Sequence, residues 1–245
     1  MILSEAKVVV TGGCSGLGRA TVEGFVAEGA QVTAFDLQGD APAGAGVQHV
    51  DVRDETAVAA ALDAAIADMG GLTAVVNCAG IATGEKVVGR DGPHALDTFQ
   101  RTIDINLVGS FNVARLAAAR MAEQAPDAGG MRGVIVNTAS IAAFEGQKGQ
   151  AAYAASKAGI AGLSLPMARD LARQGIRVMA IAPGIFRTPM LESLGQEIMD
   201  GLAADVTFPQ RLGDPAEFAA LARFIVSCDY LNGTVIRIDG ALRMP

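Results

Sequence analysis

Two side chains capable of acid–base chemistry lie one helical turn apart in the second half of the chain. Tyr153 and Lys157 stand in the run AAYAASKAGI, and Ser140 precedes Tyr153 by thirteen residues. Positions i and i+4 share one face of a helix, and the small residues around them let another surface approach closely. Such a pair is also common in helices that only pack. Proton transfer and packing therefore both remain open at this point.

The composition indicates a globular protein with a small-molecule partner. The 245 residues are 51% hydrophobic and include 30 glycines, which suffices for one large core in a single domain, residues 1–245. The formal net charge of -7 argues against nucleic-acid and membrane partners. Both partners need clustered Lys and Arg to neutralise phosphate.

The cysteines and histidines show neither a disulfide pattern nor a metal pattern. Cys14, Cys78 and Cys228 are odd in number and far apart, and His49 and His94 have no partner at metal-ligand spacing. We expect buried thiols, a reducing compartment and no metal.

The N-terminus, MILSEAKVVVTGG, carries an acid and a lysine where a signal peptide needs an unbroken apolar core. No apolar run reaches the ~18 to 20 residues that cross a bilayer. We expect a cytoplasmic protein.

Short β-branched runs alternate with Ala-rich segments along the chain. The runs are KVVV, QVTAF, VQHV, TAVVN, GVIVN, IRVMAIA and TVIRI. This alternation predicts an α/β fold, a single-domain Rossmann-like doubly wound parallel sheet of about seven strands with helices on both faces. Because the runs are apolar throughout, we expect strands buried from both sides.

Two segments depart from the alternation. Residues 37–46, LQGDAPAGAG, are poor in helix formers, which predicts an irregular crossover that leaves one sheet edge less covered. Residues 184–210, GIFRTPMLESLGQEIMDGLAADVTFPQ, insert an amphipathic segment after a predicted strand. We expect a substrate lid there, with a surface helical hairpin as the alternative.

A glycine-rich turn follows the first predicted strand. In TGGCSGLGRA, Gly12, Gly16 and Gly18 allow a pyrophosphate to approach the backbone at a helix N-terminus, with Ser15 and Leu17 in the same turn. The spacing G-x-x-x-G-x-G differs from the general dinucleotide fingerprint. The motif therefore needs support from its surroundings.

Asp36 supplies that support. It ends the second run, where its carboxylate can accept hydrogen bonds from ribose hydroxyls and repel a 2′-phosphate. Neither Ser15 nor Leu37 brings a positive charge for such a phosphate, so we expect NAD and not NADP. A turn residue at the strand end is the alternative for Asp36.

Further candidates follow the third and fourth runs. Asp51 and Val52 stand in HVDVRD, and Asn77, Ala79 and Gly80 stand in VVNCAGI. The ligand crevice of an open α/β sheet lies outside the carboxyl ends of its strands, so these residues should meet in one cleft. Asp51 could equally cap the next helix.

Taken together, TGGCSGLG, NCAG, Asn106 in DINLVGS, Ser140, YAASK and APG at 182–184 resemble the short-chain dehydrogenase/reductase family. The resemblance spans essentially the whole chain. Longer segments, including RLGDPAEF and LNGTVIRIDGALRMP, resemble its type II 3-hydroxyacyl-CoA dehydrogenase subgroup, which also acts on hydroxysteroids. The short crossover and Arg187 beside the predicted lid depart from that subgroup. Arg187 either meets an acidic substrate group or faces solvent.

The resemblance implies roles for individual residues. Tyr153 would be the general acid/base, and Ser140 would hydrogen-bond the reacting oxygen. Lys157 would hold the nicotinamide ribose, and Asn106 would anchor a water-linked proton path. A free tyrosine titrates near ~10, so a base at neutral pH needs its pKa lowered, which Lys157 and the positive nicotinamide ring can supply.

The remaining expected contacts involve the cofactor and the substrate. Gln147 is a candidate substrate contact beside Ser140 and Tyr153, with a surface position as the alternative. Thr188 either contacts the cofactor or forms a plain turn or cap. The full set of expected cofactor residues is Gly12, Ser15, Gly16, Leu17, Gly18, Asp36, Leu37, Asp51, Val52, Asn77, Ala79, Gly80, Tyr153, Lys157, Pro183, Gly184 and Thr188.

Three functions follow from these expectations. The first is an NAD-dependent dehydrogenase of fatty acid metabolism that interconverts 3-hydroxyacyl-CoA and 3-ketoacyl-CoA. The second keeps the chemistry but acts on a hydroxysteroid or another hydrophobic secondary alcohol. The third is a noncatalytic dinucleotide-binding scaffold, which the intact Ser140, Tyr153 and Lys157 oppose.

A flat helix surface also suggests self-association. Family members pair such helices, so we expect a homotetramer, with a dimer as the alternative and monomeric packing as the simplest reading. The chain end, DGALRMP, is a second candidate contact. The small residues of the flat surface are Ala154, Ala155, Ala158, Ala161 and Gly162.

Overall fold

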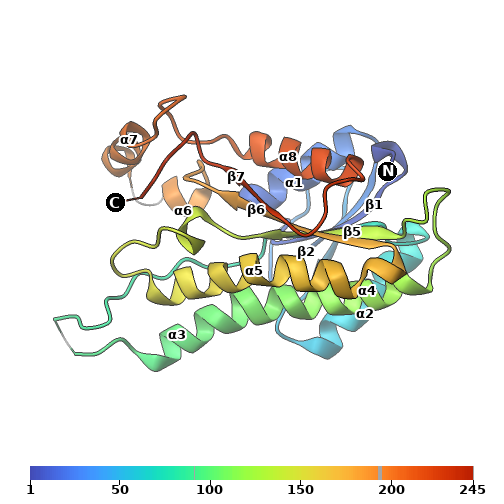
Figure 1. Ribbon diagram of the computed structural model, residues 1–245, viewed down its shortest axis with the longest axis horizontal. Helices are drawn as coiled ribbons and strands as arrows, with labels where there is room; N and C mark the ends of the chain where they lie inside the picture. The colour runs from blue at the N-terminus through green and yellow to red at the C-terminus, as the bar shows by residue number, and fades with distance from the viewer. Residues whose placement is uncertain (91, 193–194, 245) are drawn as a thin grey trace.

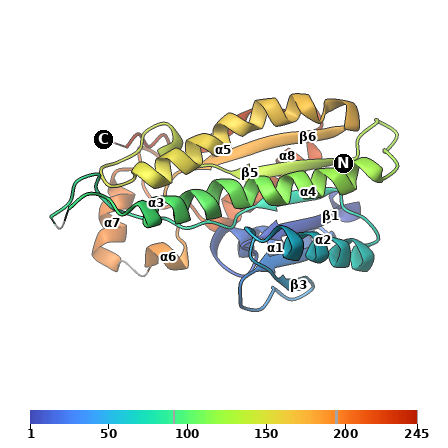
Figure 2. The ribbon, with the colours of Figure 1, turned by 90° about the horizontal axis from the view of Figure 1, so that it is seen from below.

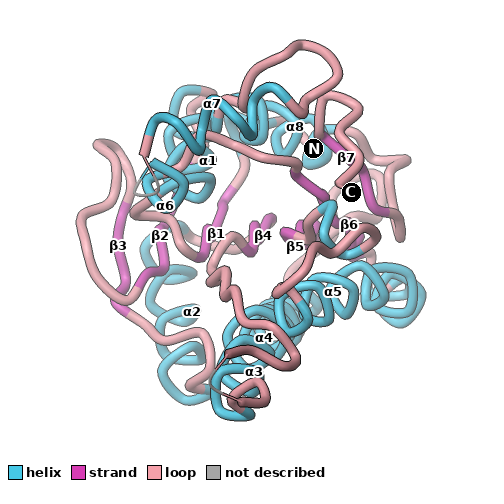
Figure 3. Tube along the Cα trace, turned by 90° about the vertical axis from the view of Figure 1, so that its left-hand side faces the viewer, coloured by secondary structure: helices cyan, strands magenta, loops and turns pink. Residues whose placement is uncertain are grey.

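The computed structural model describes residues 1–90, 92–192 and 195–244. Its centre is a seven-stranded parallel sheet in the order β3-β2-β1-β4-β5-β6-β7, which Figure 3 shows end to end. The strand order reverses direction between β1 and β4, at the middle of the sheet. The strands are β1 (Lys7–Thr11), β2 (Gln31–Asp36), β3 (Gly46–His49), β4 (Ala74–Asn77), β5 (Gly133–Thr138), β6 (Ile176–Pro183) and β7 (Val235–Ile238).

Helices cover both faces of this sheet, which confirms the predicted fold class (Figures 1 and 2). On one face lie α1 (Gly16–Ala27) and α8 (Pro215–Ser227), which contact each other. On the other face lie α2 (Glu55–Met69), α4 (Ser110–Glu123) and α5 (Ala151–Asp170). α3 (Leu96–Ile103) runs through a π-helical turn, Asp104–Gly109, directly into α4. Short 3-10 turns are Leu3–Glu5, Ile141–Ala143 and Ala172–Gln174.

The apolar strand runs supply two separate cores. In β1, Val9 points into the core beneath α2 and α4, whereas Val8 and Val10 point into the core beneath α1 and α8. Successive side chains of a strand face opposite sides, so a strand covered on both sides must be apolar throughout. This explains the unbroken runs of the central strands.

The expectation of burial on both sides is wrong for the two edge strands. Most of β3 is exposed and β7 is half-buried. Each has a neighbour on one side only. Residues 37–45, which precede β3, contain no helix, so the predicted irregular crossover and its less covered sheet edge are confirmed.

The segment 184–210 contains α6 (Pro189–Glu192) and α7 (Gln196–Ala204). Both lie at the end of the sheet where the strands finish, and residues 193 and 194 lie outside the described part. Within that described part, we find no helix that is both long enough and apolar enough to span a bilayer.

Candidate active site

A cleft of about 830 Å³ opens at the carboxyl ends of the central strands, beside the point where the strand order reverses. Open α/β sheets bind ligands at this position. Most of the expected site residues line it, contributed by the six strands β1 to β6 and the segments that follow them. They are Gly12, Ser15, Gly16, Leu17, Gly18, Asp36, Leu37, Asp51, Val52, Ala79, Gly80, Ser140, Gln147, Tyr153, Lys157, Pro183, Gly184 and Thr188.

The glycine-rich turn makes a cradle that larger residues would fill. Gly12 has φ +65°, and a Cβ added there would lie 2.9 Å from the backbone nitrogen of Ala79. A Cβ on Gly18 would lie 2.0 Å from the carbonyl oxygen of Gly12, so the helix meets the turn closely only because Gly18 has no side chain. α1 begins without a side-chain cap. Its first amide groups are therefore available to a phosphate.

Asp36 lies at the wall of the cleft next to this turn. Its Oδ2 accepts the backbone N–H of Cys14 at 3.0 Å, and its Oδ1 accepts that of Leu37 at 2.8 Å. The carboxylate is thus held at the end of β2 beside the glycine turn. The nearby cation Arg19 is directed to Glu23 and the carbonyl oxygen of Asp40, at 3.0 and 3.4 Å.

The end of β5 and the face of α5 bring together the three expected catalytic side chains. Lys157 is buried at 6% exposure, and its Nζ donates to the carbonyl oxygen of Thr138 at 2.7 Å and lies 5.8 Å from the centroid of the Tyr153 ring. Ser140 Oγ accepts the backbone N–H of Ala142 at 3.1 Å. That bond leaves the Ser140 hydroxyl hydrogen free to donate.

Burial shifts the two titratable groups in opposite directions. It raises the pKa of the Tyr153 phenol, although a hydrogen bond with the Ser140 side chain acts the other way. It lowers the pKa of the Lys157 ammonium to about 8. Burial therefore outweighs the other influences on the Tyr153 phenol, whereas a base at neutral pH needs the opposite shift of its pKa. The positive ring of an oxidised nicotinamide would favour that shift.

Two expected residues do not line the cleft. The amide of Asn77 is buried within the sheet, where its Nδ2 donates to Asn137 Oδ1 at 2.9 Å and to the carbonyl oxygen of Ser110 at 3.3 Å. The amide of Asn106 is buried in the π-helical turn and binds the backbone of Ile81. Both support the cleft from behind.

The structure also shows the surroundings of three residues near the cleft for which the sequence left two interpretations open. Asp51 pairs with Arg53, which lowers the pKa of its carboxyl, and Asp54 caps α2, so the helix-cap interpretation of Asp51 is wrong. Thr188 faces the glycine turn, since a Cβ on Gly16 would lie 3.6 Å from its Cγ2. Arg187 is exposed and does not line the cleft.

Several lining residues carry no local signal in the sequence. Arg101 and Ile105 reach the cleft from the end of α3 and the π-helical turn, and Met244 reaches it from the chain end. Their helix and tail are far in sequence from the recognisable motifs. At the end near Ser140 and the segment 184–210, the wall includes the apolar side chains of Ile185, Leu191, Ile198, Leu202 and Met244.

Within the described residues, no three His, Cys, Asp or Glu side chains form a group that could hold a metal ion. All three cysteines are free thiols. Burial raises the pKa of Cys78, which lies in the cleft wall, to about 11. This thiol is therefore protonated at neutral pH.

Comparisons with known proteins agree with this geometry. A model of the family described as short chain dehydrogenase matches residues 6–198. The 3-hydroxyacyl-CoA dehydrogenase type-2 of Homo sapiens is 52% identical over 96% of this chain and 94% of its own length. That of Drosophila melanogaster is 50% identical over 99% of both.

Two solved structures are similar throughout. The crystal structure of 3-hydroxyacyl-CoA dehydrogenase type-2 from Mycobacterium avium has a TM-score of 0.93 and 43% identity, covering 99% of this chain and 98% of that one. Ligand-free aldohexose dehydrogenase from Thermoplasma acidophilum has a TM-score of 0.87 and 27% identity, covering 98% and 94%.

Proposed function

This chain belongs to the short chain dehydrogenase family of oxidoreductases, and we propose that it is an NAD-dependent dehydrogenase acting on 3-hydroxyacyl-CoA thioesters. One observation carries the proposal. Ser140, Tyr153 and Lys157 line the same cleft as the glycine turn and Asp36, so alcohol chemistry and dinucleotide binding share one site. The relatives named for the thioester reaction match nearly the whole chain, which supports the substrate class.

The residues present fit a dinucleotide. The glycine cradle and the uncapped start of α1 suit its pyrophosphate, and Asp36 suits the adenosine ribose. The carboxylate of Asp36 disfavours a 2′-phosphate by repulsion, which supports NAD over NADP. Bound there, the nicotinamide ring would accept a hydride from the carbinol carbon of the alcohol.

The side chains of the cleft then transfer the proton of the alcohol hydroxyl group. Tyr153 takes the hydroxyl proton during oxidation and returns it during reduction. Ser140 Oγ already accepts the N–H of Ala142, so the Ser140 hydroxyl hydrogen can turn from the Tyr153 oxygen to the reacting oxygen when the alcohol binds. Lys157, anchored on the carbonyl oxygen of Thr138, keeps two N–H groups for the nicotinamide ribose and for the space beside Tyr153.

We propose that residues 184–210 form the substrate lid. Leu191, Ile198 and Leu202 of this segment line the cleft. These side chains would cover the acyl chain and exclude water from the reacting carbon. The same apolar wall favours a second candidate substrate, a hydroxysteroid or another hydrophobic secondary alcohol.

We also propose that the chain forms a homotetramer. α4 and α5 lie side by side (Figure 2). Phe111 of α4, Leu165 of α5 and Val108 of the π-helical turn before α4 are exposed at 43%, 45% and 47%. Ala158 and Gly162 of α5 are exposed and small, and no described atom outside the helix's own turn lies within 4 Å of a Cβ built on Gly162. A second copy of this face would bury these side chains.

The test of the reaction is NADH absorbance during oxidation of (S)-3-hydroxybutyryl-CoA. We expect turnover with NAD, far less with NADP, and none for Tyr153→Phe, which should still bind NAD. The chain has two tyrosines, and Tyr230 is fully exposed, so Tyr230→Phe is the matched control with unchanged activity. If the wild type binds NAD and leaves the thioester unchanged, the substrate assignment is wrong. A panel of hydroxysteroids and alcohols then tests the second candidate.

A further inference from the structure

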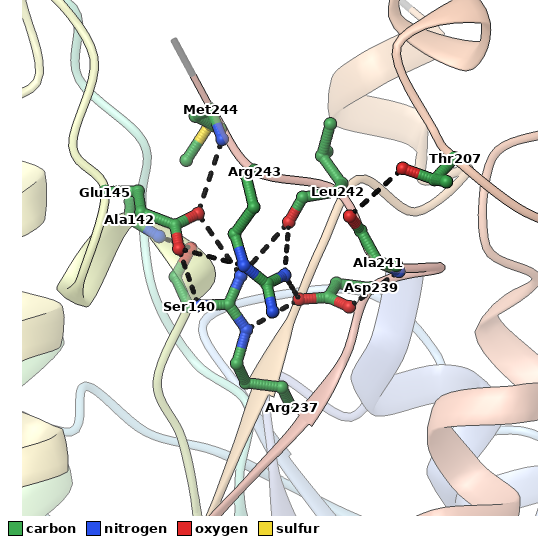
Figure 4. Close-up of polar contacts among 10 residues, drawn as sticks. All are labelled: Ser140, Ala142, Glu145, Thr207, Arg237, Asp239, Ala241, Leu242, Arg243 and Met244. Atoms are coloured by element: carbon green, nitrogen blue, oxygen red, sulfur yellow. Dashed lines mark hydrogen bonds and ion pairs between the residues drawn. The ribbon is translucent and has the colours of Figure 1, made fainter.

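Four charged side chains tie the chain end to the segment that follows Ser140 (Figure 4). Both carboxylate oxygens of Glu145 accept the guanidinium of Arg237, at 2.9 and 3.2 Å. Arg237 also donates to Asp239 at 2.6 Å, and Arg243 bridges the two acids at 3.2 Å to Asp239 and 3.4 Å to Glu145. Arg237 holds the pKa of the Glu145 carboxyl below its ordinary value, so this carboxylate is charged at neutral pH.

The tail beyond β7, residues 239–244, reaches the active-site cleft at Met244. The backbone N–H of Met244 donates to Glu145 Oε2 at 3.3 Å, and the Met244 side chain lines the cleft. Leu242 is buried against Ile141 and Val206. The subunit contact that the sequence suggests for this chain end stays a prediction, while within the subunit the same segment packs beside the active site.

Glu145 lies one short turn from the catalytic serine. Ser140 opens the 3-10 turn Ile141–Ala143, and the backbone N–H of Glu145 donates to the carbonyl oxygen of Ile141 at 3.0 Å. The ring of Phe144 lies 5.7 Å from the Arg237 guanidinium. A displacement of Glu145 would therefore move the turn that sets the direction of the Ser140 hydroxyl.

We propose that Glu145 is a positioning residue for the reaction, and that Met244, which Glu145 holds at the cleft, limits the size of the group on the alcohol carbon. This inference rests on the proposed function, because it assigns the Ser140 end of the cleft to the alcohol. Glu145 acts through the turn and the tail and touches no reacting atom. Supporting contacts of this kind decide whether a site reaches its productive geometry.

The first test compares Glu145→Gln with Asp63→Asn. Asp63 also receives two bonds from one guanidinium, that of Arg120, at 2.6 and 3.0 Å, and neither residue lines the cleft. We expect Glu145→Gln to lower kcat about tenfold or more on every alcohol that the wild type oxidises, because small misplacements near the reacting atoms are costly. Its dissociation constant for NAD should stay unchanged, and Asp63→Asn should change neither quantity.

A second comparison tests whether Glu145 acts through its ion pair with Arg237. If Glu145 acts through Arg237, the variant carrying both Glu145→Gln and Arg237→Met should lose no more kcat than the worse single variant. A merely structural role predicts similar losses of thermal stability for Glu145→Gln and Asp63→Asn with no difference in kcat. Equal kcat values in these two variants would overturn the positioning role.

The third comparison tests Met244. We expect Met244→Ala to raise kcat/KM for (S)-3-hydroxypalmitoyl-CoA relative to (S)-3-hydroxybutyryl-CoA about tenfold, since pocket volume discriminates by this order. Met131→Ala, a partly buried methionine outside the cleft, is the control. An unchanged ratio in Met244→Ala would remove the chain end from substrate selection.

A readout without substrate separates this proposal from the proposed function. In spectra of protein labelled with methyl-13C methionine, the Met244 signal, identified by its loss in Met244→Ala, should move in Glu145→Gln and stay in Asp63→Asn. A Met244 signal that stays in place in both variants would show that Glu145 does not hold Met244 at the cleft. A wild type that oxidises no acyl-CoA refutes the proposed substrate instead, and the kinetic comparisons then use the alcohol that it does oxidise.

Discussion

The side-chain amide of Asn106 hydrogen-bonds both the backbone N–H and the backbone carbonyl oxygen of Ile81. Asn106 Nδ2 donates to the carbonyl oxygen of Ile81 at 2.9 Å, and Asn106 Oδ1 accepts the Ile81 N–H at 2.8 Å. A Cβ on Gly80 would lie 3.1 Å from the same Oδ1 and 3.7 Å from Lys157 Nζ. The π-helical turn thus clamps the loop after β4, which forms one wall of the cleft beside Lys157.

Replacing Asn106 with Ala should therefore cost both stability and cofactor binding. It leaves two backbone groups of Ile81 without partners, and an unsatisfied buried group costs about 1–3 kcal/mol. Urea unfolding and NAD titration measure the two effects. Asn232→Ala, which removes one bond to the Val178 N–H from an exposed side chain, should cost less and leave NAD binding intact. Equal effects of the two variants would contradict the role of Asn106 in fixing the loop after β4.

Asp36 should decide between the two dinucleotides. In Asp36→Ser the repulsion of a 2′-phosphate is removed and the ribose contact weakened, so the ratio of kcat/KM for NADP over NAD should rise at least about tenfold, or about 1.4 kcal/mol. Steady-state kinetics with both cofactors measure the ratio. Asp40→Asn removes an exposed carboxylate from the same loop and should leave the ratio unchanged. A similar rise in both variants would indicate a general charge effect.

Lys157 should make a contribution to the stability of the cofactor-free protein that rises with pH. Its pKa falls from 10.5 to about 8 on folding. Between these values the unfolded chain binds the proton and the folded chain does not, so this contribution to the free energy of unfolding rises by at most about 1.4 kcal/mol per pH unit.

Urea titrations from pH 8 to 10 in wild type and in Lys157→Met test this contribution, because the stability difference between the two proteins should grow with pH. Cys78 and Tyr153, whose pKa values burial raises, lower stability with rising pH in both proteins and cancel in the comparison. Lys148→Met, at an exposed lysine, controls for the loss of one positive charge. A wild-type slope that matches Lys157→Met would mean that the buried ammonium keeps its proton.

Gly18→Ala should prevent the glycine turn from closing on α1. The added Cβ would lie 2.0 Å from the carbonyl oxygen of Gly12, so the turn must shift and the pyrophosphate cradle is lost. We expect a large loss of NAD affinity by calorimetry. Gly201→Ala in α7, where no described atom outside its own helical turn lies within 4 Å of the new Cβ, should stabilise the protein by about 1 kcal/mol. NAD affinity retained by Gly18→Ala would argue against this cradle.

Gly162→Arg should separate the proposed subunits. In the assembly, the guanidinium on the flat face of α5 would be buried against apolar side chains of the second copy. The free energy needed to bury this unpaired charge should exceed the free energy that association gains from apolar burial. Sedimentation velocity should show smaller species for this variant. Ala128→Arg, at an exposed loop position, adds the same charge and should leave the assembly unchanged. A wild type that sediments as a monomer would refute the association itself.

The local features of the fold were readable from the sequence. Apolar runs of strand length between Ala-rich segments can bury both faces only inside a parallel sheet, and the structure confirms this for its central strands. The glycine turn, Asp36 and the pair Tyr153 and Lys157 were readable for the same reason. Each depends on neighbours a few residues away, or on the rule that parallel strands end at one edge of the sheet.

Only the tertiary structure decided which polar residues face the cleft. Asn77 and Asn106 both follow recognisable patterns, yet one is bonded to Asn137 within the sheet and the other to the Ile81 backbone. Nothing local to Met244 places it at the cleft, because its position depends on Glu145, 99 residues away. Contacts between distant segments form only when the whole chain packs. The residues that make such contacts therefore follow no periodicity or spacing that could be recognised in the sequence.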